Sequence, residues 1–251
     1  MEQNLSEELI ISAAAQVHED WCNQELKAFF GRAQEARKVT NSPGDALRQA
    51  CYKGDQKRNE VDLDVGYLVG HETYASRCLD DFEVFKSLVD STAIEVKRFA
   101  NRDLTPEEAA KAGTNYKDGQ ENILRPFIEL SSDSKKENLE AAIGAFNVYV
   151  QMSQAGISIE QMKNDPEMQG LIGVAIHTDW LKRNMDHPND ELKVPYSDLD
   201  EWTQQQDLTV FNALLNVVEK NKDRFAVAPV EGVSLPDYQE EERSLLGQKG
   251  K

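Results

Sequence analysis

Hydrophobic residues recur at intervals of three and four positions along most of this chain, which is the spacing of one face of an α-helix. Near the N-terminus, Leu9, Ala13 and Val17 begin such a series, which continues to about Phe30. Further series predict helices over residues 46–52, 80–102, 105–113, 132–153 and 201–218, and a pair of helices that start near 157 and 165. The second helix of that pair should reach about residue 184.

Residue types that favour helix ends flank these segments, since short polar side chains cap the first turn and glycine permits the turn that ends a helix. The predicted caps and stops are Thr105, Gly113, Ser131 or Ser132, Gly156, and Asp198 or Asp200. The sequence therefore predicts a mainly α fold.

Two regions depart from the helical spacing. Val61, Leu63 and Val65 alternate with acidic residues, a period of two that favours a strand, so residues 61–71 predict at most one short hairpin or an extended loop. Residues 115–122 are expected to be a loop. From residue 226 to 251 the chain is rich in Pro, Gly and charge with no apolar period, and we expect a loosely held, flexible tail there.

One polar and aromatic pattern occurs twice. Residues 176–207 read I-H-T-D-W-L-K-R-N, a short turn, and then L-K-V-P-Y-S-D-L before the next helix. A weaker copy is split between V-H-E-D-W at 17–21 and L-R-P-F-I-E-L-S-S at 124–132. From Pro126 and from Pro195 the two copies align without a gap. Trp180 precedes its proline by 15 positions and Trp21 precedes its own by 105, so about 90 residues are inserted in the first copy.

This pattern resembles the ryanodine-receptor repeat, which occurs in tandem in animal calcium-release channels and also in small bacterial and phage proteins. The matching segments cover about half of the chain. The resemblance implies two repeats related by a pseudo-twofold axis, each a helix, an extended crossing segment and a second helix. The first repeat would span residues 1–156 with a largely helical insertion at about 31–122, the second 157–225, and the tail 226–251.

The resemblance implies no enzyme. In the channels the tandem unit is regarded as a docking and adenine-nucleotide-binding surface, with a base held between the tryptophans of both copies. Here those tryptophans would be Trp21 and Trp180. The basic residues expected near the ligand are Arg125, Lys182, Arg183 and Lys193.

The residue types leave alternatives open at these positions. His18 with Trp21, and His177 with Trp180, are i,i+3 pairs that share one helix face. Each tryptophan either packs in the core, with the histidine tying its ring N–H to a neighbouring segment, or offers a flat platform to a purine or a cation.

The other candidate positions carry the same ambiguity. Phe127 and Tyr196 occupy matching positions, where they either pin the crossing segment to the core or contribute to the ligand site. Lys182 and Arg183 suit an anionic ligand, but they also suit the last turn of a helix, where the macrodipole favours positive charge.

Charge and composition narrow the classes of function. Twenty-eight basic and 45 acidic residues give a net charge of −17, which makes nucleic acid an improbable partner. No apolar run reaches the length of a membrane span, and the N-terminus lacks a secretory pattern, so we expect a cytoplasmic protein without a membrane partner. Three cysteines with no C-x-x-C pair are typical of a reduced compartment.

Enzymatic and metal-binding motifs are weak or missing. The sequence contains no Gly-rich phosphate loop and no G-x-S-x-G, and we expect no catalytic residue and no cofactor. A zinc site could be assembled only from His18, Cys22, His71 and Cys78, whose spacing is a poor match to known sites.

Two hypotheses follow. In the first, the chain is a binding module for a nucleotide or a nucleotide-derived signalling molecule held between the two repeats, as a receptor or a sequestering sponge. In the second, its acidic surface and its insertion recruit a protein partner, as an adaptor or an inhibitor. The sequence does not indicate an oligomeric state.

Overall fold

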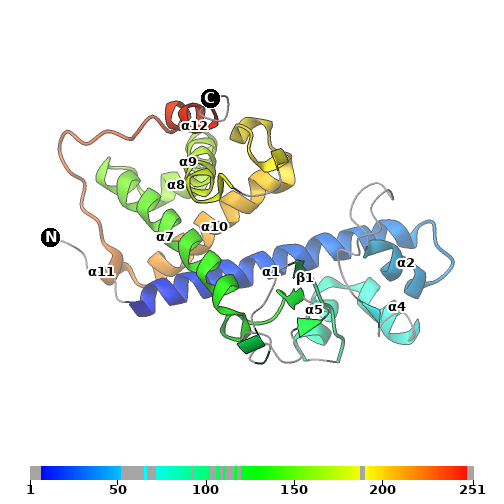
Figure 1. Cartoon of the computed structure of the whole chain (residues 1–251). Helices are drawn as coiled ribbons and strands as arrows, with labels where there is room; N and C mark the ends of the chain where they lie inside the picture. The colour runs from blue at the N-terminus through cyan, green and yellow to red at the C-terminus, as the bar shows by residue number, and fades with distance from the viewer. Residues whose placement is uncertain are drawn as a thin grey trace. The chain divides into compact units, whose positions relative to one another are not determined.

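A computed structural model describes residues 7–51, 65–66, 72–91, 93–101, 106–107, 110, 116–117, 120–186 and 190–247 (Figure 1). The described chain is mainly helical, as the sequence predicts. It folds into two compact units, one formed by Met1–Trp21 with Lys136–Lys251 and the other by Cys22–Lys135. We call the first the repeat unit, because it contains the whole second copy of the sequence pattern, and the second the insertion unit, because it contains most of the residues between the two parts of the first copy. The first helix, α1 (Glu7–Arg37), contributes residues to both.

The insertion unit is built on a compact apolar core. The second half of α1 packs with α2 (Pro43–Ala50), α4 (Glu72–Asp80) and α5 (Phe82–Asp90). The rings of Phe29 and Phe85, both fully buried, lie 5.7 Å apart at its centre. This core explains why residues 22–135 form a compact unit, since it buries apolar surface from four helices.

A small antiparallel sheet completes the insertion unit. Its strands are β1 (Phe99–Asn101), β2 (Tyr116–Lys117) and β3 (Gln120–Asn122), in the order β1-β3-β2. The prediction of at most one hairpin was therefore wrong, as was the loop expected over residues 115–122. Such short strands give too few alternating positions for a sequence pattern to reveal them.

The helix predicted over residues 80–102 was right at its start and wrong at its end. Asp81 starts α5, because its backbone is extended and its carboxylate accepts the N–H of Glu83 at 2.7 Å. The chain leaves that helix at Ser91, and Phe99 lies in β1. The predicted hairpin at 61–71 and helix at 105–113 lie mostly outside the described residues.

The repeat unit is helical. Besides the start of α1, its helices are α7 (Ser132–Gln154, whose first turn belongs to the insertion unit), α8 (Ile159–Asn164), α9 (Pro166–Asn184), α10 (Glu201–Lys220), α11 (Lys222–Phe225) and α12 (Tyr238–Gly247). The four from α7 to α10 begin and end close to the predicted positions, whereas α11 and α12 were not predicted. Asp200, one of the two predicted caps, accepts the N–H of Thr203 at 3.1 Å and starts α10. Gly156 follows the end of α7 with a φ of 85°, which glycine adopts without strain.

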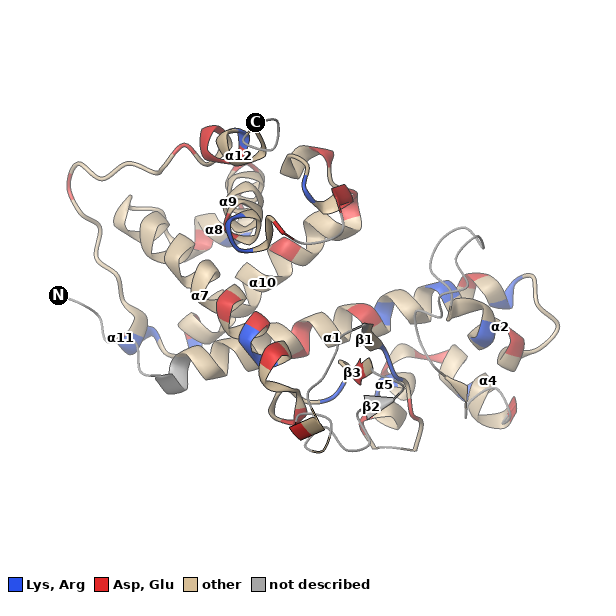
Figure 2. Ribbon diagram, in the orientation of Figure 1, with Lys and Arg blue, Asp and Glu red and all other residues tan. Residues whose placement is uncertain are grey.

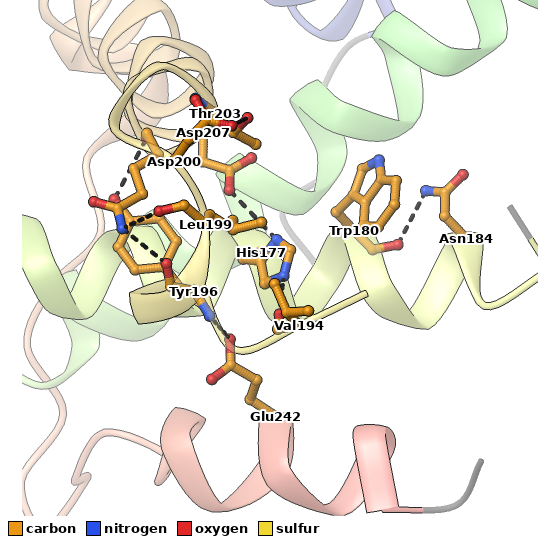
Figure 3. Close-up of polar contacts among 11 residues, drawn as sticks. His177, Trp180, Asn184, Val194, Tyr196, Leu199, Asp200, Thr203, Asp207 and Glu242 are labelled. Atoms are coloured by element: carbon orange, nitrogen blue, oxygen red, sulfur yellow. Dashed lines mark hydrogen bonds and ion pairs between the residues drawn. The ribbon is translucent and has the colours of Figure 1, made fainter. Parts of the chain in front are cut away.

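Helix α9 is the centre of this unit, and α8, α10 and α12 all pack against it. In Figures 1 and 3, α9 lies between α10 and α12. Among the described residues between α9 and α10 are two short 3₁₀ turns, η3 (Asp190–Leu192) and η4 (Tyr196–Asp198). The equivalent turn of the first copy, η2 (Phe127–Glu129), belongs to the insertion unit.

The expected flexible tail was wrong for residues 238–247, because α12 docks on α9. Tyr238 and Glu242 are buried there, and the Tyr238 hydroxyl donates to Gln151 Oε1 at 2.6 Å. Polar contacts to distant residues hold this helix, so its own sequence shows little apolar period. The predicted boundaries at 156 and 225 do not separate compact units, since both positions lie inside the repeat unit.

Candidate binding site

The two prolines that align in the sequence have the same backbone conformation. Pro126 has φ −51° and ψ 144°, and Pro195 has φ −53° and ψ 145°. Each is followed by a single 3₁₀ turn closed by two backbone hydrogen bonds of 2.8 and 3.2 Å. Leu130 and Leu199 then return the chain to extended conformation at matching angles. The sequence correspondence is therefore also a correspondence of local structure.

The two histidine–tryptophan pairs are alike as well. The rings of His177 and Trp180 lie 5.9 Å apart with 9° between their planes, and those of His18 and Trp21 lie 5.9 Å apart with 25° between them. Both histidines are buried, whereas both tryptophans are half-buried. Each indole is thus held beside a buried imidazole and retains partial exposure.

His177 is fixed from two sides (Figure 3). Its Nε2–H donates to the carbonyl oxygen of Val194 at 2.9 Å, which is the contact to a neighbouring segment that the sequence suggested. Its Nδ1 lies 3.5 Å from Asp207 Oδ2 on α10. That distance exceeds a normal hydrogen bond, so the attraction between the two side chains is mainly electrostatic.

Burial and charge shift the acidities around this histidine. Burial alone would lower the pKa of His177, but Asp207, the Val194 carbonyl and Glu242 together raise it above its ordinary value. Burial also raises the pKa of Asp207 and the pKa of Glu242, against the opposing effect of their partners. All three groups therefore hold protons more tightly in the folded protein than in an unfolded chain.

Tyr196 anchors the crossing segment to α9. Its ring is 8% exposed and lies directly against the backbone of Gly173, where a Cβ atom would be 2.2 Å from Tyr196 Cζ. The Tyr196 N–H donates to Glu242 Oε1 at 2.9 Å, and Gln204 donates to the Tyr196 carbonyl at 3.0 Å. Tyr196 thus plays the pinning role that the sequence offered as one alternative. Phe127, its counterpart in the insertion unit, is half-buried.

The basic candidates are all paired with carboxylates. Lys182 Nζ lies 2.7 Å from Glu241 on α12, and Arg183 lies 3.0 Å from Asp179 one turn earlier on α9. Lys193 lies 3.3 Å from Asp190, and Arg125 in the insertion unit lies 2.6 Å from Glu129. An anionic ligand would have to compete with these acids.

A cavity of about 720 Å³ opens between the N-terminal half of α9, the η4 segment and α12. Its apolar lining consists of Met168, Leu171, Val174, Pro195 and Tyr196. Neither Trp21 nor Trp180 is among its lining residues. Sequence reasoning missed this cavity, apart from Tyr196, because one wall is α12, a segment predicted to be loose.

The cysteines and acids give no sign of a metal site within the described residues, where no group of three or more His, Cys, Asp and Glu is arranged to hold an ion. His71, one member of the possible zinc set, lies outside them. Cys22, Cys51 and Cys78 form no disulfide among the described residues, and burial raises the pKa of Cys78 to about 11. Among the described helices, none combines the length and the apolar character needed to cross a membrane.

Comparison with protein-family models, with curated proteins and with solved structures finds no match to this chain. Residues 17–21 with 124–146, and residues 176–219, therefore resemble each other in sequence and in the local geometry of their prolines and histidine–tryptophan pairs.

Proposed function

We propose that this protein is a non-enzymatic binding module that recognises a nucleotide or a nucleotide-derived molecule through the indole rings of Trp21 and Trp180. The observation that carries the proposal is the repeated pair of half-buried indoles, each held at 5.9 Å from a buried imidazole. A flat aromatic face that keeps partial exposure is a surface on which a purine base stacks.

The surroundings of His177 support this role. A buried imidazole held by Val194 and Asp207 leaves the neighbouring indole little freedom, and a fixed platform loses less entropy when it binds a ligand. Stacking of one base on an aromatic side chain contributes about 1–3 kcal/mol, so two platforms acting together would give a useful but moderate affinity.

Phosphate groups would add to this affinity through the last turn of α9. Lys182 and Arg183 lie two and three positions after Trp180, and their present carboxylate partners are at least partly exposed. Exposed ion pairs contribute only about 0–1 kcal/mol, so a phosphate, which carries more charge, can displace Glu241 and Asp179 from them.

The net charge of −17 favours a second candidate, an acidic module that binds a protein partner. In Figure 2 acidic residues recur along the helices of each unit. Such binding would weaken steeply with salt, because charges on exposed surfaces are screened over about 10 Å at 0.1 M ionic strength. An affinity for a protein partner that does not change with salt would contradict this charge-led alternative.

The direct test is a thermal-shift and calorimetric titration with ATP, ADP, ADP-ribose and cyclic nucleotides. A ligand at 100 times its dissociation constant adds about 2.7 kcal/mol to the free energy of unfolding. The substitutions Trp180→Ala and Trp21→Ala should abolish this gain, whereas Trp202→Phe, which changes the tryptophan on α10, should preserve it. The absence of any shift with all of these ligands at millimolar concentration would refute the proposal.

A further inference from the structure

We infer that the cavity between α9, η4 and α12 is a second binding site, and that its ligand is a small organic cation: an amine or guanidinium group attached to an apolar body. This site is independent of the tryptophan platforms, whose side chains do not line it. Its volume of about 720 Å³ falls in the range of cavities that enclose small molecules.

The apolar part of the ligand is indicated by one side of the cavity. Met168, Leu171 and Val174 lie three positions apart on α9 and present one continuous apolar stripe. Pro195 and the buried ring of Tyr196 continue this wall from the crossing segment. The free energy of the system falls when an apolar group replaces the water in contact with such a wall. The ligand should therefore carry a hydrocarbon or aromatic body.

The positive charge of the ligand is indicated by Glu242. This residue lines the cavity although it is only 5% exposed, and its side chain points from α12 toward Tyr196 (Figure 3). Among the described residues its one hydrogen-bond donor is the Tyr196 N–H, which contacts Oε1. Its other electrostatic partner is the buried His177, so the carboxylate has room for a further donor, which a cation in the cavity would supply.

The other charged residues that line the cavity also favour a positively charged ligand. Asp165 and Glu167 add two carboxylates at the start of α9, and the carboxylate of Asp165 accepts the N–H groups of that helix. Arg243 is the basic residue of the lining, and it lies 3.1 Å from Glu240 on its own helix. Three carboxylates against one already paired guanidinium repel the phosphates of a nucleotide.

An organic cation fits this site better than a metal ion does. Hard cations such as calcium take six or more oxygen ligands, whereas most of this cavity is apolar. Tyr196 also lines the cavity, and aromatic side chains attract ammonium and guanidinium groups.

Two variants should prevent binding at this site, one by removing the charge of the carboxylate and the other by filling the cavity. Glu242→Gln deletes the charge but keeps a carbonyl oxygen for the Tyr196 N–H, so α12 should stay docked. Gly170→Phe fills the cavity, because Gly170 lines it and a Cβ atom there meets nothing within 4 Å. Glu231→Gln, which removes an exposed carboxylate that does not line the cavity, is the matched charge control.

The experiment is calorimetry on the full chain with benzylamine, tryptamine and agmatine, compared with benzyl alcohol, benzoate and a short arginine-containing peptide. We expect a free amine to bind at least about tenfold more tightly than benzyl alcohol, and both Glu242→Gln and Gly170→Phe to weaken it by about tenfold or more. Glu231→Gln should leave the affinity unchanged, and none of the three variants should alter nucleotide binding.

Three results would overturn the inference. One is equal binding of amine and alcohol, or of amine and benzoate. Another is an amine affinity that neither Glu242→Gln nor Gly170→Phe changes. The third is binding of the peptide without binding of any free amine up to about 10 mM, which would assign the cavity to a protein partner instead.

Discussion

Two glycines three positions apart on α9 should respond to the same substitution with opposite sign. At Gly173 an added Cβ would lie 2.2 Å from Tyr196 Cζ and 2.3 Å from its hydroxyl oxygen, whereas at Gly170 it would meet nothing within 4 Å. Gly173→Ala and Gly170→Ala therefore make the same chemical change in the same helix. They differ only in what the new methyl group meets.

The magnitudes follow from packing and helix propensity. Carbon atoms in contact prefer separations of about 3.5–4.0 Å, so the Tyr196 ring would have to move by more than about 1 Å to admit the methyl group. The ring is buried, and its backbone is held by Glu242 and Gln204, so this displacement meets resistance. Overpacking of this kind lowers the free energy of unfolding by about 1–3 kcal/mol or more, while replacing glycine by alanine in a helix raises it by about 1 kcal/mol.

We therefore expect Gly170→Ala to stabilise the repeat unit by about 0.5–1 kcal/mol and Gly173→Ala to destabilise it by about 1–2 kcal/mol. Urea denaturation followed by tryptophan fluorescence measures this difference. All three tryptophans belong to the repeat unit, so their emission reports its unfolding and not that of the insertion unit. Hydrogen exchange of the α9 and α10 amides gives a second measurement of the same stability.

The reasoning would be refuted if Gly173→Ala were as stable as Gly170→Ala. That result would mean that Tyr196 does not lie against the backbone of α9. The cavity would then lose the wall that the Tyr196 ring provides, and the proposed cation site would lose its geometry along with it.

Two further predictions concern charge and capping. Because the pKa values of His177, Asp207 and Glu242 are all raised on folding, the native state binds more protons than the unfolded chain, and its stability should fall as pH rises from about 5 to about 8. Urea titrations across this range measure how steeply the free energy of unfolding falls with pH, and His177→Gln should make this dependence weaker. A free energy of unfolding that rises with pH would contradict the raised pKa values. Asp200→Ala should cost about 1 kcal/mol by removing the cap of α10, whereas Asp198→Ala, which removes an exposed carboxylate, should change the urea midpoint little; equal effects of the two would place the cap elsewhere.

Local sequence signals were sufficient to place α7, α8, α9 and α10 of the repeat unit. The D-P-E start of α9 and the cap at Asp200 act within one turn of the residues that they organise, so a pattern of neighbouring residues encodes them. The same holds for the 3₁₀ turns after Pro126 and Pro195, since proline fixes its own φ and restricts the residue before it.

Elements held by distant partners could not be predicted in this way. Helix α12 depends on Gln151, which is 87 positions from Tyr238, and on Tyr196, which is 46 positions from Glu242. Four of its ten residues are charged, and the Pro, Gly and charged residues of 226–251 suggested a loosely held tail. The cavity was missed for the same reason, because one of its walls exists only when α12 is docked.

The histidine–tryptophan pairs could be predicted in part. The i,i+3 spacing placed both rings of each pair on one helix face, and the structure adds that they lie nearly parallel at His177 and Trp180. The partners of His177 could not be identified from the sequence, because Val194 lies 17 positions away and Asp207 lies on the next helix. Only the fold shows that a carbonyl and a carboxylate approach opposite nitrogens of one imidazole.

The two copies of the pattern also differ in a way that bears on function. Each crossing segment is met by a buried glutamate from another element, Glu121 of β3 in the first copy and Glu242 of α12 in the second. Glu121 accepts the N–H and hydroxyl of Ser131 and the hydroxyl of Ser134, so its charge is fully solvated by donors. Glu242 receives one backbone N–H among the described residues and faces a cavity. Since a buried carboxylate with unfilled hydrogen-bonding capacity raises the free energy of the folded state, a ligand that supplies positive charge stabilises the second copy and gains nothing comparable at the first. The glutamate beside the first copy thus has its hydrogen-bond donors within the protein, whereas we infer that the glutamate beside the second copy takes one from a ligand.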